Sequence, residues 1–309
     1  MNCPICGSNK LRFLSDVKDV EYWTSDDIFS YYECLSCQLV FLKDPPCDKL
    51  DEIYPDTYYS TDFEIKKEFS INSFLGKVKL FLDKKFFRRA LSSIKDREQL
   101  SCLDIGGGSG WMLNVLRSAD NRVRHTSVVD LNLKSRDIAE RNGHVFYCQN
   151  IDSVKFRNQF DVVLMFNLIE HISDPKGVLE AINIAMRPGA LAIIKTPNTR
   201  SWNRKIFETK YWGGYHAPRH WMLFNEKNFR MICEEVGFVV QKLSYTQGAP
   251  QWVASILGTY FANKEKKLIM HKTPSFSVLM LFFSILDFVL LPFRRTDQIF
   301  VELRKKDYQ

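Results

Sequence analysis

The chain has 309 residues, 45% of them hydrophobic and 26% charged, which is the composition of an ordinary globular protein with a full core and room for a smaller appendage. Its formal net charge of +7 is uneven: residues 1–60 carry 5 Lys/Arg against 11 Asp/Glu, residues 64–97 carry 10 against 4, and residues 264–309 carry 9 against 5. The acidic N-terminus speaks against a nucleic-acid partner, because phosphate binding needs Lys and Arg.

The first residues, "MNCPIC", have no basic region followed by an apolar stretch and a small-residue cleavage site. No export signal is therefore predicted, and the protein is expected in the cytoplasm. In this reducing compartment two CxxC pairs indicate a metal site, and the other four cysteines are expected to be buried thiols: Cys47, Cys102, Cys148 and Cys233.

Residues 1–60 are predicted to form a zinc-binding module. The turns "CPICG" and "CLSCQ" each supply two thiolates to a tetrahedral ion, and the 27 residues between them are enough for a short hairpin. The four ligands are Cys3, Cys6, Cys34 and Cys37. Gln38 stands where Gly is usual in such a turn, so its backbone must reach the turn conformation without glycine's freedom. Four cysteines leave no open coordination position, so the zinc is expected to be structural; a redox dithiol is the alternative.

Residues 61–97 are expected to form a basic linker with an amphipathic helix over 72–94. The helix places Phe74, Val78, Phe81 and Leu82 on one side. The positive side chains around it are Lys77, Lys79, Lys84, Lys85, Arg88 and Arg89. Such a helix either covers a sheet edge, the commoner arrangement, or lies on an anionic membrane surface.

The segment "SCLDIGGGSGW" combines a buried strand with a glycine loop of the pattern DxGxGxG, formed by Asp104, Gly106, Gly108 and Gly110. A dinucleotide fingerprint would require another glycine at position 111, which is Trp. A carboxylate before the glycines would repel a diphosphate, whereas it suits a ligand that carries an ammonium group. S-Adenosylmethionine is such a ligand.

The next predicted strand, "RHTSVVD", ends at Asp130, which lies 26 residues after Asp104. This spacing fits one strand, loop, helix and strand, and the Asp130 carboxylate can accept hydrogen bonds from both ribose hydroxyls of an adenosyl group. The two carboxylates and the glycines together predict a site for S-adenosylmethionine. A glycine turn without a ligand is the alternative.

The rest of residues 98–309 alternates between strands and helices. Further strands are predicted at 144–148, 160–167, 191–198, in "VVQKLSY" and at 297–305, and helices in "PKGVLEAINIAMRPG" and "EKNFRMICEEVGF". Seven strands with helices between them predict an α/β fold, a doubly wound Rossmann-like parallel sheet whose last strand is antiparallel.

Catalytic groups are sought after the fourth and fifth of these strands, because ligands of open α/β sheets lie beyond the carboxyl ends of the strands. "FNLIEHI" contains Asn167, which we assign to the donor site, and His171. The insertion 197–225 is rich in Trp, Tyr, His and Arg and contains His216 and His220. A neutral imidazole is the natural base for an acceptor hydroxyl, so the three histidines are the candidate catalytic residues. For His171 a bracing role in its loop is equally open.

Four more side chains of this insertion are candidate acceptor-binding groups. Tyr215 and Arg219 could bind a phosphate or sugar hydroxyls, and Trp212 and Trp221 could stack on a sugar ring. The alternatives are a solvated arginine and aromatic side chains that only pack the lid.

The segment 275–293 has nineteen residues and one charge, Asp287. This length is borderline for a membrane span, and basic residues on both sides give no orientation: Lys264, Lys266, Lys267 and Lys272 before it, and Arg294, Arg295, Arg304, Lys305 and Lys306 after it. A span would also separate the final strand from its sheet. We therefore predict an apolar helical insertion over 250–293 that lies in the core, at a dimer contact or in a membrane interface.

The motifs "LDIGGGSG", "FDVVLMFNLIEHISDP", "RPGALAIIKTPN" and "PRHWMLFNEKNFRMICEEVGF" resemble the successive motifs of class I S-adenosylmethionine-dependent methyltransferases. The leader, with "CPICGS", "YYECLSCQLVFLKDPP" and "IYPDTYY", is similar to that of a bacterial zinc-binding subgroup associated with sugar and surface-polysaccharide biosynthesis. The resemblance implies His220 as the first choice for the base and His216 as the second. It also implies adenine contacts from Asn150 and Asp152, with Asn150 standing where Asp is frequent.

The sequence thus predicts a cytoplasmic, zinc-stabilised methyltransferase that acts on a nucleotide-linked or lipid-linked sugar or glycan intermediate. The alternatives are an RNA-modifying methyltransferase with a zinc module and a donor-binding scaffold without turnover. Besides the acceptor, the partners considered are the inner face of a membrane, as a peripheral contact, and a second copy of the chain in a homodimer.

Overall fold

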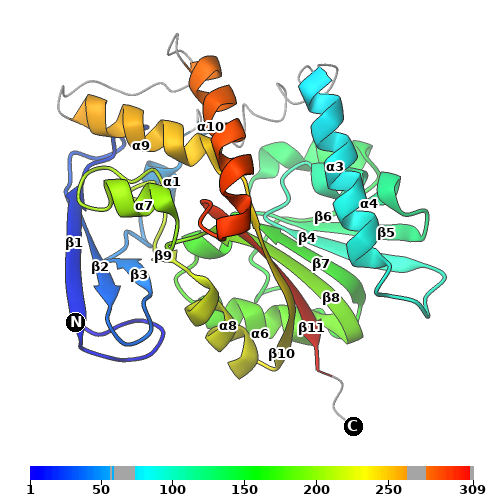
Figure 1. Cartoon of the computed structure of the whole chain (residues 1–309). Helices are drawn as coiled ribbons and strands as arrows, with labels where there is room; N and C mark the ends of the chain where they lie inside the picture. The colour runs from blue at the N-terminus through cyan, green and yellow to red at the C-terminus, as the bar shows by residue number, and fades with distance from the viewer. Residues whose placement is uncertain (56–57, 59–73, 263–275, 307–309) are drawn as a thin grey trace.

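A seven-stranded sheet forms the centre of the chain in the computed structural model, which describes residues 1–55, 58, 74–262 and 276–306 (Figure 1). The strand order is β10-β11-β8-β7-β4-β5-β6. The strands are β4 Leu100–Ile105, β5 Val123–Val129, β6 Val145–Tyr147, β7 Phe160–Phe166, β8 Met186–Pro197, β10 Phe238–Thr246 and β11 Gln298–Lys305. Strands β4 to β8 pair in parallel, and β11 runs antiparallel to both β8 and β10. The predicted doubly wound sheet is confirmed, with its last strand inserted beside β8.

Helices cover both faces of this sheet, because its central strands carry apolar side chains on both sides. Strand β7 is an apolar run that is buried along almost its whole length, which is typical of a parallel strand with helices on both sides. Its Val163 and Met165 belong to one core and its Val162 and Leu164 to another. The covering helices are α3 Phe74–Leu91, α4 Trp111–Ala119, α5 Arg136–Arg141, α6 Pro175–Ala185 and α8 Glu226–Glu235.

The N-terminal segment forms a second, four-stranded antiparallel sheet of order β1-β2-β3-β9 (Figure 1). Its strands are β1 Leu11–Val17, β2 Phe29–Cys34, β3 Val40–Leu42 and β9 Met222–Leu223. The short helix α1 Leu50–Ile53 follows β3 along the chain. The hairpin predicted between the two CxxC turns is confirmed in β1 and β2. Strand β9 comes from the insertion 197–225 and pairs Leu223 with Val40. The N-terminal segment therefore packs directly against the part of the chain that forms the seven-stranded sheet, and the two share one hydrophobic core.

Helix α3 is confirmed, but the predicted apolar side is the exposed one. Its C-terminal half packs into the core through Phe87, Ala90 and Leu91, whereas Val78, Phe81 and Leu82 are exposed. The side chain of Phe74 and residues 59–73 lie outside the described residues. Periodicity alone could not decide which of two apolar stripes meets the sheet, because both are present.

In its described residues, the insertion between β10 and β11 contains the helices α9 Ala249–Ala262 and α10 Phe276–Leu290 and the 3-10 helix η4 Leu291–Phe293. It leaves the sheet at Thr246 and returns at Gln298, and these two residues are register partners. Among the residues that the structure describes, one helix, Phe276–Phe293, is long and apolar enough to cross a membrane. Only 11% of this segment is buried within the protein. A place in the core is therefore excluded for α10. Lys264, Lys266, Lys267 and Lys272 lie outside the described residues.

Candidate functional site

The glycine loop between β4 and α4 has the backbone that the sequence predicts. Gly106, Gly108 and Gly110 have φ of 69°, 53° and 75°, a left-handed region that favours glycine. The loop also wraps closely over the end of β4, since a Cβ on Gly107 would lie 2.5 Å from the carboxylate of the buried Asp104. These glycines let the backbone pass where a side chain would not fit.

Asp130 follows β5 and lies against the same loop. Its Oδ2 accepts a hydrogen bond from the Gly108 amide at 2.9 Å, and its Oδ1 accepts one from the Asn132 amide at 2.8 Å. Burial raises the pKa of Asp130, and the two amides oppose this shift. Each carboxylate oxygen still has a lone pair to accept a hydroxyl. The structure thus brings together the two features that the donor-site prediction requires.

Three further residues predicted for the donor site lie at the same edge of the sheet. Asn150 and Asp152 are exposed in the turn after β6, and Asn167 is exposed at the end of β7 with a φ of 51°. Leu168, the next residue, contacts the glycine loop, because a Cβ on Gly106 would lie 2.9 Å from its Cδ2. The contacts that these three residues make with a donor stay a prediction.

The three candidate catalytic histidines form one cluster. His171 lies in the 3-10 helix η2 Ile169–His171 after β7, while His216 and His220 come from the segment between α7 Trp202–Phe207 and β9. The ring of His220 lies 4.6 Å from that of His171 and 4.9 Å from that of His216, between ring centroids. Because η2 follows Leu168, the cluster sits next to the glycine loop.

The N-terminal segment supplies hydrogen-bond partners to two of these rings. Tyr54 Oη lies 2.8 Å from His171 Nδ1, and Tyr58 Oη lies 3.2 Å from His216 Nε2. Glu21 Oε1 lies 3.0 Å from His216 Nδ1. The first sixty residues therefore shape the site directly.

His220 has a defined tautomer in its neutral form. Its Nδ1 donates to the carbonyl oxygen of Gly214 at 2.7 Å, so Nε2 carries the lone pair. Burial, with the neighbouring histidines, lowers the pKa of His220 well below its usual value, and burial lowers that of His171 to about 3. Both imidazoles are neutral at pH 7.

Glu170 completes the cluster and was missing from the predicted site residues. Burial raises the pKa of this fully buried carboxyl to about 7, although Thr196 Oγ1 donates to its Oε2 at 2.9 Å. Its Oε1 has no hydrogen-bond partner among the described residues. Glu170, His171 and His220 present side-chain ligand atoms within 4.8 Å of one another. The sequence signal was a carboxylate beside a histidine at the end of a buried strand.

The side chains predicted to bind the acceptor are buried and already engaged within the protein. Arg219 is fully buried, pairs with Asp19 at 2.8 Å, and donates from Nε to the carbonyl oxygen of Ile53 at 2.7 Å. Burial alone would raise the pKa of Asp19, but Arg219 outweighs it and holds the value at about 2. This pair ties the N-terminal segment to the loop of the histidines.

The aromatic members of that set are packed in the same way. Tyr215 stacks on Tyr31 with ring centroids 4.3 Å apart, and Trp212 is fully buried. Trp221 donates from Nε1 to the carbonyl oxygen of Pro218 at 2.9 Å. These positions favour structural roles; acceptor contacts by Trp212, Tyr215, Arg219 and Trp221 remain a prediction.

The four predicted zinc ligands come together. Cys3 Sγ lies 3.6 Å from Cys37 Sγ, and Cys6 Sγ lies 3.5 Å from Cys34 Sγ. Four thiolates at about 2.3 Å from a tetrahedral zinc are about 3.8 Å apart, so the arrangement fits the ion. The two turns are alike, with φ of 70° at Gly7 and 64° at Gln38, as expected for a glutamine in a glycine position.

The other cysteines only partly follow expectation. Cys102 and Cys233 are buried, and Cys148 is partly buried. Cys47 is exposed, which corrects its assignment as a buried thiol. It lies in a Pro-rich surface loop, where hydrophobic residues have no strand to bury them.

Comparison with known proteins agrees with this geometry. Residues 77–243 match the family model described as "Methyltransferase domain". The chain belongs to this methyltransferase family.

Curated relatives of this methyltransferase include the "Ubiquinone biosynthesis O-methyltransferase" of Bradyrhizobium sp. (strain ORS 278), 27% identical over 186 residues, which cover 55% of this chain and 71% of the relative. The protein of the same name from Bradyrhizobium diazoefficiens is 23% identical with the same coverage. A chain in the complex of the Haloferax volcanii Trm112 methyltransferase activator with a methyltransferase shares the fold, with a TM-score of 0.50, 14% identity, and coverage of 77% of this chain and 97% of that one. The protein is an S-adenosylmethionine-dependent methyltransferase.

Proposed function

We propose that this methyltransferase is an O-methyltransferase whose acceptor hydroxyl approaches the histidine cluster, with His220 Nε2 as the atom that takes the hydroxyl proton. The observation that carries the proposal is the neutral His220, whose Nδ1 donates to the Gly214 carbonyl oxygen and whose ring lies 4.6 Å from that of His171. S-Adenosylmethionine supplies a methyl group on a sulfonium, which is already activated for displacement. What remains for the chain is to align the acceptor and remove its proton.

Glu170 gives the proton a second position. The low pKa of His220 means that a buried imidazolium is poorly stabilised there. Glu170 is ionised in part at neutral pH because its pKa is about 7, and its carboxylate lies within 4.8 Å of the histidine nitrogens. A carboxylate tuned to this range suits general base catalysis, so the pair His220 and Glu170 can hold the proton between them.

The two Bradyrhizobium relatives are named as O-methyltransferases of ubiquinone biosynthesis, which supports oxygen as the methylated atom. It gives no support to the sugar or glycan acceptor that the leader's resemblance implies, or to an RNA acceptor. We therefore place aromatic hydroxyls first among the possible acceptors and nucleotide sugars second.

We also propose that Cys3, Cys6, Cys34 and Cys37 bind a structural zinc ion. The support is the mutual placement of four sulfur atoms in two matching turns. With no open position, the ion would cross-link the two turns of the N-terminal sheet and hold Tyr54, Tyr58 and Glu21 against the histidines.

The test is transfer of a labelled methyl group to a panel of catechols, quinols and nucleotide sugars. His220→Gln should lower kcat by roughly 100-fold or more, which is the usual contribution of a general base, while donor binding by calorimetry is retained. His125→Gln, a change at an exposed histidine on β5, is the matched control and should keep full activity. Full activity in His220→Gln, or methylation of nitrogen or carbon, would contradict the proposal.

A further inference from the structure

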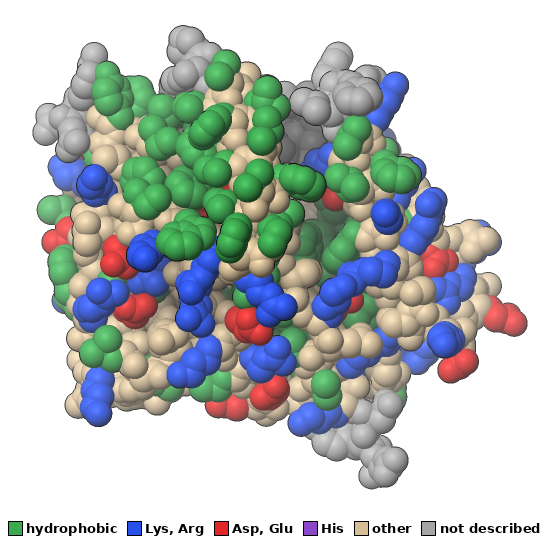
Figure 2. Space-filling view, viewed as in Figure 1, with side chains coloured by type: hydrophobic (Ala, Val, Ile, Leu, Met, Phe, Trp, Pro, Cys, Tyr) green, Lys and Arg blue, Asp and Glu red, His purple; other side chains and the backbone are tan. Residues whose placement is uncertain are grey.

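The outer face of α10 is an exposed apolar surface. Five of its residues recur at the spacing of one helix face, and Phe293 of η4 follows them; each of the six is at least half exposed: Val278, Leu281, Phe282, Ile285, Phe288 and Phe293. We call these six residues the apolar face. Figure 2 shows hydrophobic side chains gathered over α9 and α10, with Lys and Arg below them. Patches of this kind on a monomer mark binding surfaces for proteins or membranes.

The opposite side of α10 is firmly attached to the protein. The Phe283 ring stacks on Trp252 of α9 at 5.1 Å with an interplanar angle of 5°. Asp287, the single charged residue of the helix, is fully buried; its carboxylate accepts hydrogen bonds from the Gly248 amide at 2.6 Å and from Trp252 Nε1 at 3.0 Å. The one charge is thus turned inward, and the helix is held with its uncharged side outward.

Basic side chains border this face. Arg294 and Arg295 are exposed directly after it, and Arg295 donates to the carbonyl oxygen of Arg200 at 3.1 Å. Helix α7 begins at Trp202, whose amide donates to the carbonyl oxygen of Arg295. Trp202 and Lys205 of this helix are both exposed. We call Arg200, Lys205, Arg294 and Arg295 the basic belt.

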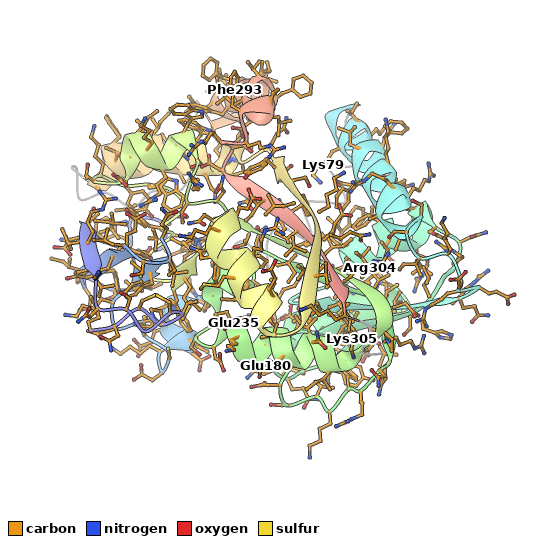
Figure 3. All side chains as sticks on the ribbon, turned by 60° about the horizontal axis from the view of Figure 1, so that its bottom comes forward. Lys79, Glu180, Glu235, Phe293, Arg304 and Lys305 are labelled. Atoms are coloured by element: carbon orange, nitrogen blue, oxygen red, sulfur yellow. The ribbon has the colours of Figure 1, made fainter. Side chains whose placement is uncertain are left out.

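A second helix with the same character projects to the same side. Figure 1 shows that α3 and α10, which are set apart from each other, both rise beyond the same edge of the sheet. The exposed half of α3 carries Val78, Phe81 and Leu82 with Lys77 and Lys85 around them. Figure 3 places Lys79 and Phe293 toward one side of the molecule and the acidic Glu180 and Glu235, on α6 and α8, toward the other.

We propose that the apolar face and the basic belt dock this protein on an anionic lipid surface, with α10 lying at the level of the head groups. Apolar side chains bordered by Lys and Arg match the apolar and anionic layers of such a surface. A single crossing by α10 is excluded, because the insertion leaves and re-enters the sheet at the partners Thr246 and Gln298 and both of its ends therefore lie on the same side. A return crossing by α9 does not fit the structure, because most of the residues from Ala249 to Gly258 are buried within the protein. A second copy packed in parallel on this face would bring two basic belts together, which is unfavourable.

This surface lies close to the acceptor end of the sheet. Gln298, the first residue after the insertion, pairs with Pro197, the last residue of β8. Ligands of such sheets lie beyond the carboxyl ends of the parallel strands. Docking would therefore place the histidine cluster's side of the protein toward the lipid, where a membrane-soluble acceptor is concentrated. The docking itself does not depend on the proposed reaction.

The experiment is flotation of the full chain with vesicles of phosphatidylglycerol and phosphatidylcholine, and with vesicles of phosphatidylcholine alone. We expect binding to the anionic vesicles that weakens with salt. The double variant Phe282→Ser/Phe288→Ser should lower the partition coefficient at least about tenfold, because two exposed aromatic side chains no longer enter the interface. Ile184→Ser, at an exposed apolar residue on α6, is the matched control and should bind as the parent does.

Arg294→Gln together with Lys205→Gln should weaken the preference for anionic vesicles while leaving the fold intact, since both side chains are exposed and two residues of the basic belt remain. The proposal is overturned if the parent protein floats with neither vesicle type. It is also overturned if the double phenylalanine variant binds like the parent, or if light scattering shows a dimer that this variant dissociates, since the apolar face would then be an interface between copies.

Discussion

Glu170→Gln is expected to stabilise the protein at alkaline pH while it lowers activity. Burial raises the pKa of Glu170 from 4.5 to about 7, so the folded chain holds a proton there that the unfolded chain has released. A raised folded pKa means that stability falls as pH rises between these two values, by 1.36 kcal/mol for each unit, or about 3 kcal/mol in all. Glutamine is neutral at every pH and can still accept the hydrogen bond from Thr196 Oγ1.

Urea unfolding of parent and variant at about pH 5 and about pH 8 measures this difference. The variant should gain roughly 2 to 3 kcal/mol over the parent between the two conditions. Comparing the two proteins at each pH cancels the opposite contribution of His171, whose lowered pKa costs stability as the pH falls. Glu140→Gln, at an exposed carboxyl on α5, should show no such gain. If the stability difference between Glu170→Gln and the parent does not change with pH, the buried carboxyl is not the tuned group that the mechanism requires.

Three other changes test separate parts of the structure. Gly107→Ala should weaken donor binding in calorimetry, because its Cβ would lie 2.5 Å from the Asp104 carboxylate and displace it; unchanged affinity would show that the loop is not part of the donor site. Arg219→Met should cost roughly 3 to 5 kcal/mol in unfolding free energy by leaving Asp19 buried without its cation, and Asp19→Leu in the same chain should restore part of that loss. Cys37→Ser should lower the bound zinc measured by elemental analysis and lower Tm, whereas the exposed Cys47→Ser should change neither; equal zinc in both variants would refute the four-cysteine site.

The central sheet could be predicted from sequence because local signals and burial agree there. Strand β7 is apolar on both faces, and Asp174, directly before α6, caps that helix by accepting from the Gly177 amide at 2.9 Å. The pairing of β9 with β3 could not be predicted in this way. Two residues, Met222 and Leu223, form a strand only because a partner nearly two hundred residues earlier lies beside them.

The donor loop could be read from sequence because glycine itself reports the backbone, as the positive φ angles of Gly106 and Gly110 show. The histidines were found by residue type, but their environment was not. The neutrality of His220 and the raised pKa of Glu170 come from burial. The N-terminal segment contributes Tyr54, Tyr58 and Glu21 as partners of the neighbouring His171 and His216. Long-range burial of this kind leaves no periodic signal in the chain.

The most direct test of the account is calorimetry of the zinc-loaded protein with S-adenosylhomocysteine, compared with the Asp130→Asn variant and with NAD as the competing ligand. The account predicts one donor site per chain, weaker binding in the variant because its carboxylate no longer accepts two ribose hydroxyls, and no heat from NAD. Binding of NAD, or equal affinity of parent and variant for S-adenosylhomocysteine, would contradict it.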